Sequence, residues 1–117
     1  MLAESILLMN GACIIGYLRK KDMEFYGVDG KDLDGIVSQL RLTKGVEVAM
    51  FLYETETQTF KVSLRSNGHV DVSRIAVYFG GGGHTRAAGC DLQGSMYDVI
   101  NNVTREIERQ ICMEKVR

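Results

Sequence analysis

The stretch from Gly80 to Gly89 concentrates residue types that can bind an anion. Four consecutive glycines are followed by His84, Thr85 and Arg86. Because glycine has no Cβ, such a run can turn several backbone N–H groups toward one point and lets a ligand approach the backbone closely. His84 and Arg86 can add charge-assisted hydrogen bonds. Phosphate is the anion that this combination suits best, so the run predicts a phosphate-binding loop.

We expect the glycine-rich loop to lead into a short helix. The first turn of a helix offers unpaired N–H donors and the positive end of the helix dipole, and both favour phosphate. Ala87, Ala88 and Gly89 are small enough for such a helix to pack tightly beneath the loop, and Cys90 to Leu92 then form a possible edge strand. The alternative is a flexible hinge in which His84 and Arg86 are merely solvated.

The segment before the glycines predicts a strand with one polar face. Its apolar residues are separated by single polar ones, so a period of two sends Lys61, Ser63 and Arg65 to the face opposite Phe60, Val62 and Leu64. By the same alternation Ser66 belongs to the core side until the strand ends. Asn67-Gly68 is a turn signal. Asp71 can then cap a helix whose inward residues are Val72, Ile75, Ala76 and Phe79.

The remaining elements supply the frame that must position these residues. Cys13 to Leu18 reads as a buried strand, and Val46 to Tyr53 as a central strand covered on both faces. A helix from Asp32 has the apolar face Leu33, Ile36, Val37 and Leu40, and a long last helix opens on Ser95 and Asp98 with the stripe Met96, Ile100, Val103, Ile107 and Ile111. The pattern predicts an α/β fold: one compact domain with a central sheet, which we expect to be mixed, flanked by helices.

Composition limits the kinds of partner. The 117 residues include 14 basic and 15 acidic side chains, a formal charge of −1, which argues against a wide cationic face for duplex DNA or a membrane. The three cysteines form no metal-type pair and are expected to be reduced in a cytoplasmic protein. Residues 1–10 are a poor signal peptide and are expected to be a linker or helix remnant ahead of the domain at 11–117.

The motif Gly-Gly-Gly-His-x-x-Ala-Ala-Gly, present from Gly81 to Gly89, resembles the signature of the DHH-associated domain at the C-terminus of DHH phosphoesterases. Val62-Ser63-Leu64-Arg65-Ser66, Asp71-Val72 and Ile75-Ala76 are also similar to that family. Among its members, the bacterial oligoribonucleases that also dephosphorylate phosphoadenosine phosphate are the most similar group. Arg86 departs from the lysine common there; the charge is kept, although a guanidinium differs in geometry.

Seven residues form the candidate substrate-binding set, and the resemblance implies a role for six of them. Arg65 and Ser66 would contact a substrate phosphate or sugar, and the loop would hold another phosphate or the nucleotide end, through Gly81, Gly82, Gly83 and His84, with Arg86 at its mouth. The expected ligands are short single-stranded RNA or DNA and adenosine nucleotides. Hydrolysis would require a separate N-terminal DHH domain that carries manganese.

The chain itself is not expected to be a catalyst. It has only two histidines, His69 and His84, and no Asp-His-His motif, so it encodes no metal pair of the kind that phosphoryl displacement uses. Asp32-Leu33-Asp34-Gly35 hints at a calcium loop, but Gly30 and Arg41 would then occupy ligand positions. The alternative function is a nucleic-acid-binding appendage of the alanyl-tRNA synthetase type, without phosphoesterase activity.

Overall fold

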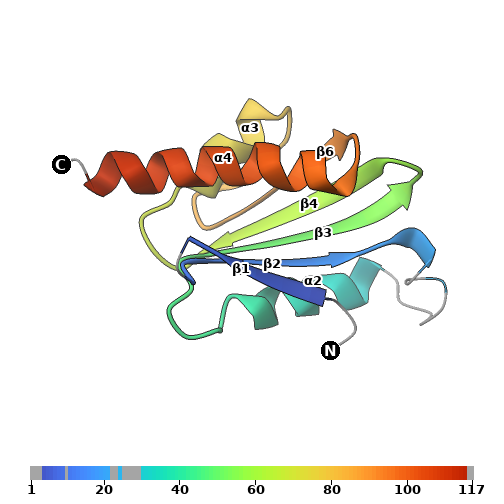
Figure 1. Cartoon of the computed structure of the whole chain (residues 1–117), viewed down its shortest axis with the longest axis horizontal. Coiled ribbons are helices and arrows are strands. Elements are labelled where there is room, and N and C mark those ends of the chain that lie inside the picture. The colour runs from blue at the N-terminus through green and yellow to red at the C-terminus, as the bar shows by residue number, and fades with distance from the viewer. Residues whose placement is uncertain (1–3, 10, 22–23, 25–29, 116–117) are drawn as a thin grey trace.

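A six-stranded sheet with helices on both faces forms the frame of the molecule (Figure 1). The computed structural model describes residues 4–9, 11–21, 24 and 30–115. The strands are β1 (Glu4–Leu8), β2 (Cys13–Leu18), β3 (Val48–Glu56), β4 (Thr59–Ser66), β5 (Gly82–His84) and β6 (Ala87–Gln93), and the helices are α2 (Gly30–Leu40), α3 (Val72–Tyr78) and α4 (Met96–Lys115).

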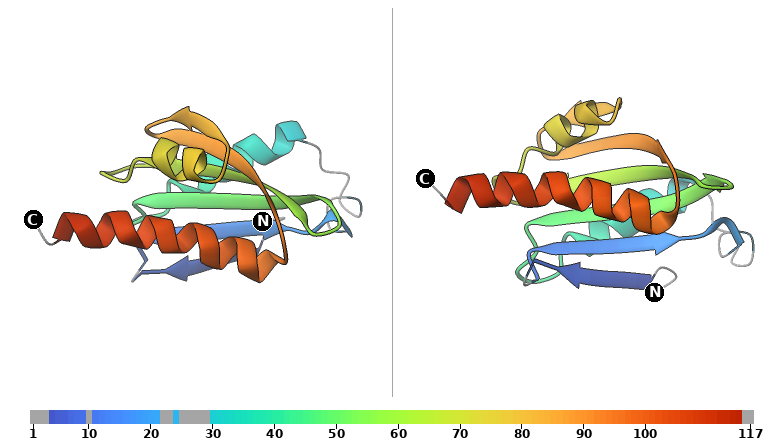
Figure 2. Two further views of the ribbon diagram at one scale, coloured as in Figure 1. Left: turned by 90° about the horizontal axis from the view of Figure 1, so that it is seen from above. Right: turned by 45° about the horizontal axis from the view of Figure 1, so that its top comes forward.

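The sheet is mixed, as predicted. Its strand order is β1-β2-β3-β4-β6-β5, and β2 and β3 are parallel whereas every other neighbouring pair is antiparallel. A parallel pair needs a crossover connection, which here contains α2. Strand β6 lies between β4 and the short edge strand β5. Helix α3 lies beside β5 and β6 (Figure 2).

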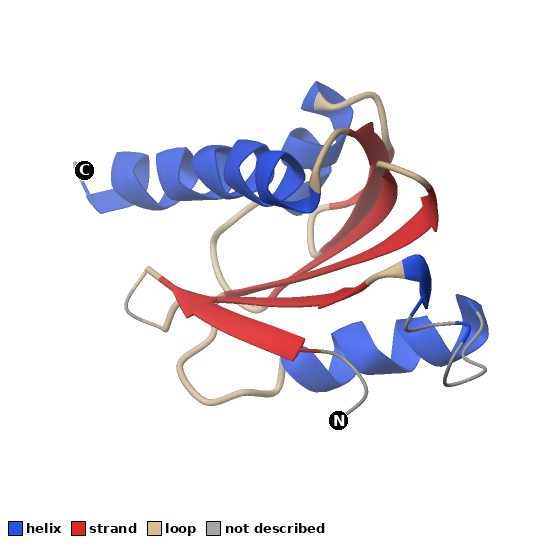
Figure 3. Ribbon diagram, turned by 45° about the vertical axis from the view of Figure 1, so that its right-hand side comes forward, coloured by secondary structure: helices blue, strands red, loops and turns tan. Residues whose placement is uncertain are grey.

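The core lies on both faces of the sheet. On one face α3 and α4 cover apolar residues of β2, β3, β4 and β6, and on the other α2 packs against β2 and β3 (Figure 3). Val48 to Leu52 of β3 are therefore buried on both faces, which confirms the predicted central strand. The alternation of β4 is also confirmed, since Phe60, Val62 and Leu64 are buried while Lys61 is exposed.

Both predicted helix caps are present. The carboxylate of Asp71 accepts hydrogen bonds from the backbone N–H groups of Ser73 and Arg74 and so begins α3. The hydroxyl of Ser95 accepts from the N–H of Asp98 at the start of α4. The predicted stripe of α4 faces the sheet: Met96, Ile100, Val103 and Ile107 are buried and Ile111 is partly buried.

Three predictions about local structure are wrong. Cys90 to Leu92, expected as a possible edge strand, belong to β6, which lies between β4 and β5. The segment expected as a linker or helix remnant contains strand β1, which pairs antiparallel with β2. The apolar residues of Glu4–Leu8 can sit on either a strand or a helix, and pairing with the buried β2 decides between them. The short helix expected after the glycines is also absent: β5, a turn at Thr85 and Arg86, and β6 form a hairpin instead.

Cys13 and Cys90 are buried and Cys112 is exposed. In the part of the chain that the structure describes, no helix is long and apolar enough to cross a bilayer.

Candidate functional site

The predicted site residues gather at one end of the sheet, on the side where α2 lies. Helix α2 covers this side over Ile14, Ala49 and Phe51 of β2 and β3. Over β4, β6 and β5 the side chains remain partly or fully accessible. We call this surface the open face; its residues, set by the strand register, are Lys61, Ser63, Arg65, Gly82, His84, Ala87, Gly89 and Asp91.

Arg65 and His84 lie in one row across three strands. Ala87 of β6 is the register partner of Arg65 on β4 and of His84 on β5. Residues directly opposite in antiparallel strands point to the same face, so the guanidinium and the imidazole flank a methyl group on the open face. Arg65 is half-buried and its Nη1 donates to the carbonyl of Leu64 at 3.0 Å, whereas His84 is exposed. The row can place two donors around one anion.

The exposed Arg86 adds a third basic side chain in the turn between β5 and β6. Two backbone hydrogen bonds fix this turn. The carbonyl of Arg86 accepts from the N–H of Ser66 at 2.9 Å, and the carbonyl of Thr85 accepts from the N–H of Val72 at 3.0 Å. The end of β4 and the start of α3 thus hold the turn beside Arg65.

Ser66 contributes to this arrangement through its backbone. The residue is 2% exposed, on the core side that alternation indicates. Its Oγ lies 3.4 Å from the N–H and 3.5 Å from the carbonyl of Gly68, so the hydroxyl stabilises the bend after β4. Of the seven predicted residues, Arg65, Gly82 and His84 lie on the open face and Arg86 lies in the adjoining turn. The side chain of Ser66 lies on the core side, and Gly81 and Gly83 lie against β6.

Two glycines of the run are required by the packing of the hairpin. A Cβ on Gly81 would lie 2.1 Å from the carbonyl oxygen of Gly89, and a Cβ on Gly83 would lie 2.5 Å from the Cα of Ala88. Gly83 also has a φ of +146°, which L side chains rarely adopt. These glycines let β5 and the chain before it lie directly against β6.

Gly82 differs from its two neighbours, because a Cβ there would meet nothing within 4 Å. It shares a register row with Gly89 of β6 and Ser63 of β4. Two of the three residues in this row therefore have no side chain, and the backbone of β5 and β6 is bare there. A ligand can approach this part of the sheet closely.

The hairpin changes the chemistry that the glycines can perform. Since no helix follows them, no helix dipole or first-turn N–H group is available at this point. In the predicted phosphate-binding loop, the N–H of Gly81 would be available to a phosphate. In the structure it donates to the carbonyl of Ala76 at 2.7 Å. The basic side chains at this end of the open face and in the adjoining turn are those of Arg65, His84 and Arg86.

Lys61 and Asp91 were not among the predicted site residues. They are exposed register partners on β4 and β6, on the open face. The alternation of β4 had already placed Lys61 on the same face as Arg65. Asp91 could not be placed in this way, because its pairing depends on the hairpin.

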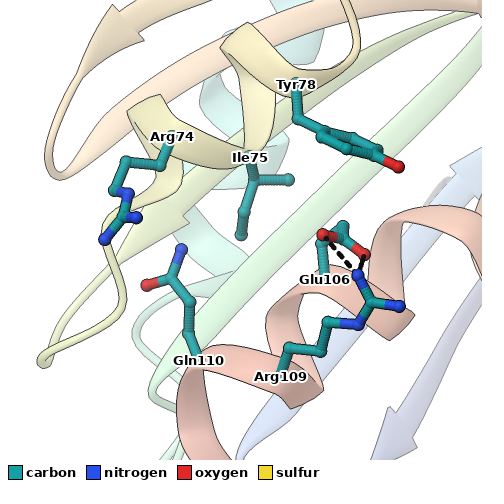
Figure 4. Close-up of a pocket in the computed structure, with 6 residues that line it drawn as sticks. All are labelled: Arg74, Ile75, Tyr78, Glu106, Arg109 and Gln110. Atoms are coloured by element: carbon teal, nitrogen blue, oxygen red, sulfur yellow. Dashed lines mark hydrogen bonds and ion pairs between the residues drawn. The ribbon is translucent and has the colours of Figure 1, made fainter. Parts of the chain in front are cut away.

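A separate hollow of about 230 Å³ lies between α3 and α4, on the opposite side of the sheet (Figure 4). In it, Arg109 forms an ion pair with Glu106 at 3.1 Å, and Ile75 and Tyr78 contribute apolar surface. Its arginines come from α3 and α4 and are not part of the open face. Within the described ranges, no group of three or more His, Cys, Asp or Glu side chains could hold a metal ion.

A mixed-sheet α/β domain with a glycine-rich hairpin beside a basic face is the class that these features define. The chain belongs to the DHHA1 domain family, whose model matches residues 10–112. This confirms the resemblance noted in the sequence.

Two relatives place the chain more closely. It is 39% identical over 84 residues to the bifunctional oligoribonuclease and PAP phosphatase NrnA of Thermus thermophilus, a match that covers 68% of this chain and 26% of that protein. The structure of an exopolyphosphatase-related protein from Bacteroides fragilis matches with a TM-score of 0.84 and 26% identity, over 96% of this chain and 33% of that one. The chain thus spans about a quarter to a third of these proteins.

The C-Ala domain of alanyl-tRNA synthetase from Aquifex aeolicus has the same fold. Its TM-score is 0.62 at 10% identity, and the match covers 88% of this chain and 96% of that domain. At this identity the likeness concerns the fold alone.

Proposed function

We propose that this chain is the substrate-recognition domain of a DHH-type phosphoesterase. It binds the phosphates of short oligonucleotides or adenosine bisphosphates and presents them to a separate N-terminal catalytic domain. The observation that carries this proposal is the row of Arg65 and His84 on the open face, with Arg86 in the adjoining turn. The family membership and the likeness to an oligoribonuclease and PAP phosphatase support the choice of ligand.

The chemistry of this domain is positioning. Arg65 donates from a planar guanidinium that matches two phosphate oxygens, and Arg86 adds a second guanidinium from the turn. Binding the phosphate on a rigid sheet fixes the orientation of the phosphoester bond before water attacks it. The metal pair that activates water would belong to the catalytic domain, where the family resemblance assigns manganese.

The test is a titration of the chain with adenosine 3′,5′-bisphosphate and with adenosine, followed by backbone amide NMR. We expect the bisphosphate to shift the amides of Gly82 to Ala87 and adenosine to leave them in place. Arg65→Ala should weaken bisphosphate binding by about 1.5–3 kcal/mol, the cost of one hydrogen bond to a charged group. Arg105→Ala is the matched control, because Arg105 is exposed on α4, on the other side of the sheet.

Equal shifts for the two ligands, or equal affinity in Arg65→Ala and Arg105→Ala, would contradict a phosphate site. With manganese present, the chain alone should not release phosphate from the bisphosphate. The second candidate is a nucleic-acid-binding appendage, which the likeness in fold to C-Ala keeps open. It predicts preference for a folded tRNA over the bisphosphate in the same titration.

A further inference from the structure

The open face has a second polar row, at the end away from the hairpin turn. Lys61 of β4 and Asp91 of β6 are register partners, and both are exposed. Lys61 and Arg65 lie four residues apart on one strand, so their side chains point to the same face. The two rows are thus parts of one continuous surface.

The two rows must contact different parts of a ligand. A strand rises about 3.4 Å per residue, so Lys61 and Arg65 are separated by about 14 Å along β4. A hydrogen bond to a phosphate oxygen spans only about 3 Å between heavy atoms. A phosphate group held by Arg65 and His84 therefore leaves Lys61 and Asp91 to another part of the molecule.

The surface between the rows allows a ligand to extend from one to the other. The intervening row is Ser63, Gly89 and Gly82, and the two glycines leave the backbone bare. A Cβ on Gly82 would meet nothing within 4 Å, so no protein atom occupies the space above it. A ligand can cross the sheet here in contact with the backbone.

The two ends differ in charge. Arg65, His84 and Arg86 are donors, whereas the register partner of Lys61 is Asp91, whose carboxylate only accepts hydrogen bonds. A phosphate beside Lys61 would be repelled by Asp91. A nucleobase or ribose is uncharged and carries both donors and acceptors, so it can use both side chains.

We infer that Lys61 and Asp91 form a nucleoside subsite. This inference rests on the proposed function. The ligand lies along β4 and β6, with its terminal phosphate toward Arg65 and His84 and an uncharged nucleoside unit toward Lys61 and Asp91. A ligand that fills both ends is a short linear oligonucleotide with a terminal phosphate, such as 5′-phosphorylated diadenylate.

The experiment compares two probes, pyrophosphate and 5′-phosphorylated diadenylate, by calorimetric titration of the whole chain. Lys61→Ala should lower the affinity for the dinucleotide about 10-fold, which is the loss of one hydrogen bond to a charged group. Asp91→Asn should lower it less, because the amide oxygen still accepts a hydrogen bond but without the charge. Asp91→Asn should leave pyrophosphate affinity unchanged or raise it, because a negative charge is removed. Arg65→Ala should weaken both probes, and Arg105→Ala neither. Lys61 and Asp91 are exposed, and amide spectra verify that the variants fold.

Two results would overturn the inference while leaving the proposed function standing. If Lys61→Ala weakens both probes by the same factor, Lys61 is a further phosphate contact. If Asp91→Asn strengthens dinucleotide binding, Asp91 repels the ligand instead of accepting from it. If neither probe binds, or if Arg65→Ala leaves the affinity for both probes unchanged, the proposed function itself fails, and the subsite fails with it.

Discussion

Gln110 on α4 holds the backbone of Asp71 with both atoms of its side-chain amide. Its Oε1 accepts from the N–H of Asp71 at 2.8 Å, and its Nε2 donates to the carbonyl of Asp71 at 3.0 Å. The next residue, Val72, donates to the carbonyl of Thr85 in the hairpin turn. Helix α4 is thereby connected to the candidate site on the opposite side of the sheet through one peptide segment.

Removing this connection should loosen the turn. We expect Gln110→Ala to lower the free energy of unfolding by about 1–3 kcal/mol, because two half-buried backbone groups of Asp71 lose their partner. Hydrogen exchange at the N–H groups of Val72 and Ser66 should accelerate more than exchange within β3. Gln39→Ala on the exposed side of α2 is the control. Equal exchange rates at Val72 in the two variants would show that Gln110 does not hold the turn.

The glycine run should separate into structural and functional positions. Gly83→Ala should destabilise the fold by about 1–2 kcal/mol or more, because Gly83 has a positive φ and its Cβ would collide with Ala88. Gly82→Val should fold normally, because its Cβ points into open space and its φ lies outside the left-handed region. If a ligand lies on the backbone there, Gly82→Val should abolish binding of adenosine bisphosphate.

Circular dichroism melting and calorimetric titration of the two glycine variants distinguish these effects. His84→Ala should give a milder loss of affinity than Gly82→Val, since one contact is lost and the surface stays open. A Gly82→Val variant that binds as well as the parent protein would contradict a ligand seated on this row.

The three thiols should react at very different rates. Burial raises the pKa of Cys13 to about 12, and burial with the nearby Asp91 charge raises that of Cys90 to about 11. Only the thiolate attacks a disulfide reagent, so at pH 8 both should be nearly inert in the folded protein. Ellman's reagent should titrate the exposed Cys112 at once and the other two only after denaturation. Rapid reaction of a second thiol in the folded protein would contradict this packing.

Asp71 should make the stability of the fold depend on acid pH. The hydrogen bond from the Ser73 hydroxyl, and then those from the Arg74 and Ser73 backbone, lower the pKa of Asp71 below that of the unfolded chain. The stabilisation is therefore complete above the unfolded value of about 3.9 and is lost as the pH falls through the folded pKa.

Asp71→Asn keeps a capping side chain but removes this titration. Urea unfolding of the parent and Asp71→Asn proteins at a series of pH values should show a difference in unfolding free energy that shrinks below about pH 4. A difference that stays constant down to pH 2 would assign the stabilisation to something other than the ionised carboxylate.

Local patterns in the sequence predicted most of the frame. The alternation from Phe60 to Arg65 and the helical spacing from Met96 to Ile107 are set by burial, and both hold in the structure. The hairpin was not predictable in this way, because Gly82 to Ala88 has too few large side chains to give a period. The hairpin forms because Gly83 of β5 pairs with Ala88 of β6 across the turn, and β6 itself pairs with β4.

The candidate site was predicted in its residue types more than in its mechanism. Arg65, Gly82, His84 and Arg86 do come together, whereas Ser66 turns inward and the N–H of Gly81 is already bonded. The alternation of β4 had indicated the inward side of Ser66, whereas the bond from Gly81 to the carbonyl of Ala76 depends on how α3 ends, which no spacing in the sequence reports.

Every residue of the open face lies between Thr59 and Gln93, in β4, β5 and β6. Strands β2 and β3 are parallel, so the connection that contains α2 must only return the chain to the end of the sheet where β2 begins. Homologous chains should therefore tolerate insertions and deletions between Leu18 and Gly30 with no change in the ligands they bind. Changes of length between Ser66 and Ala87 should be rare, because the turn is held from both sides within that interval.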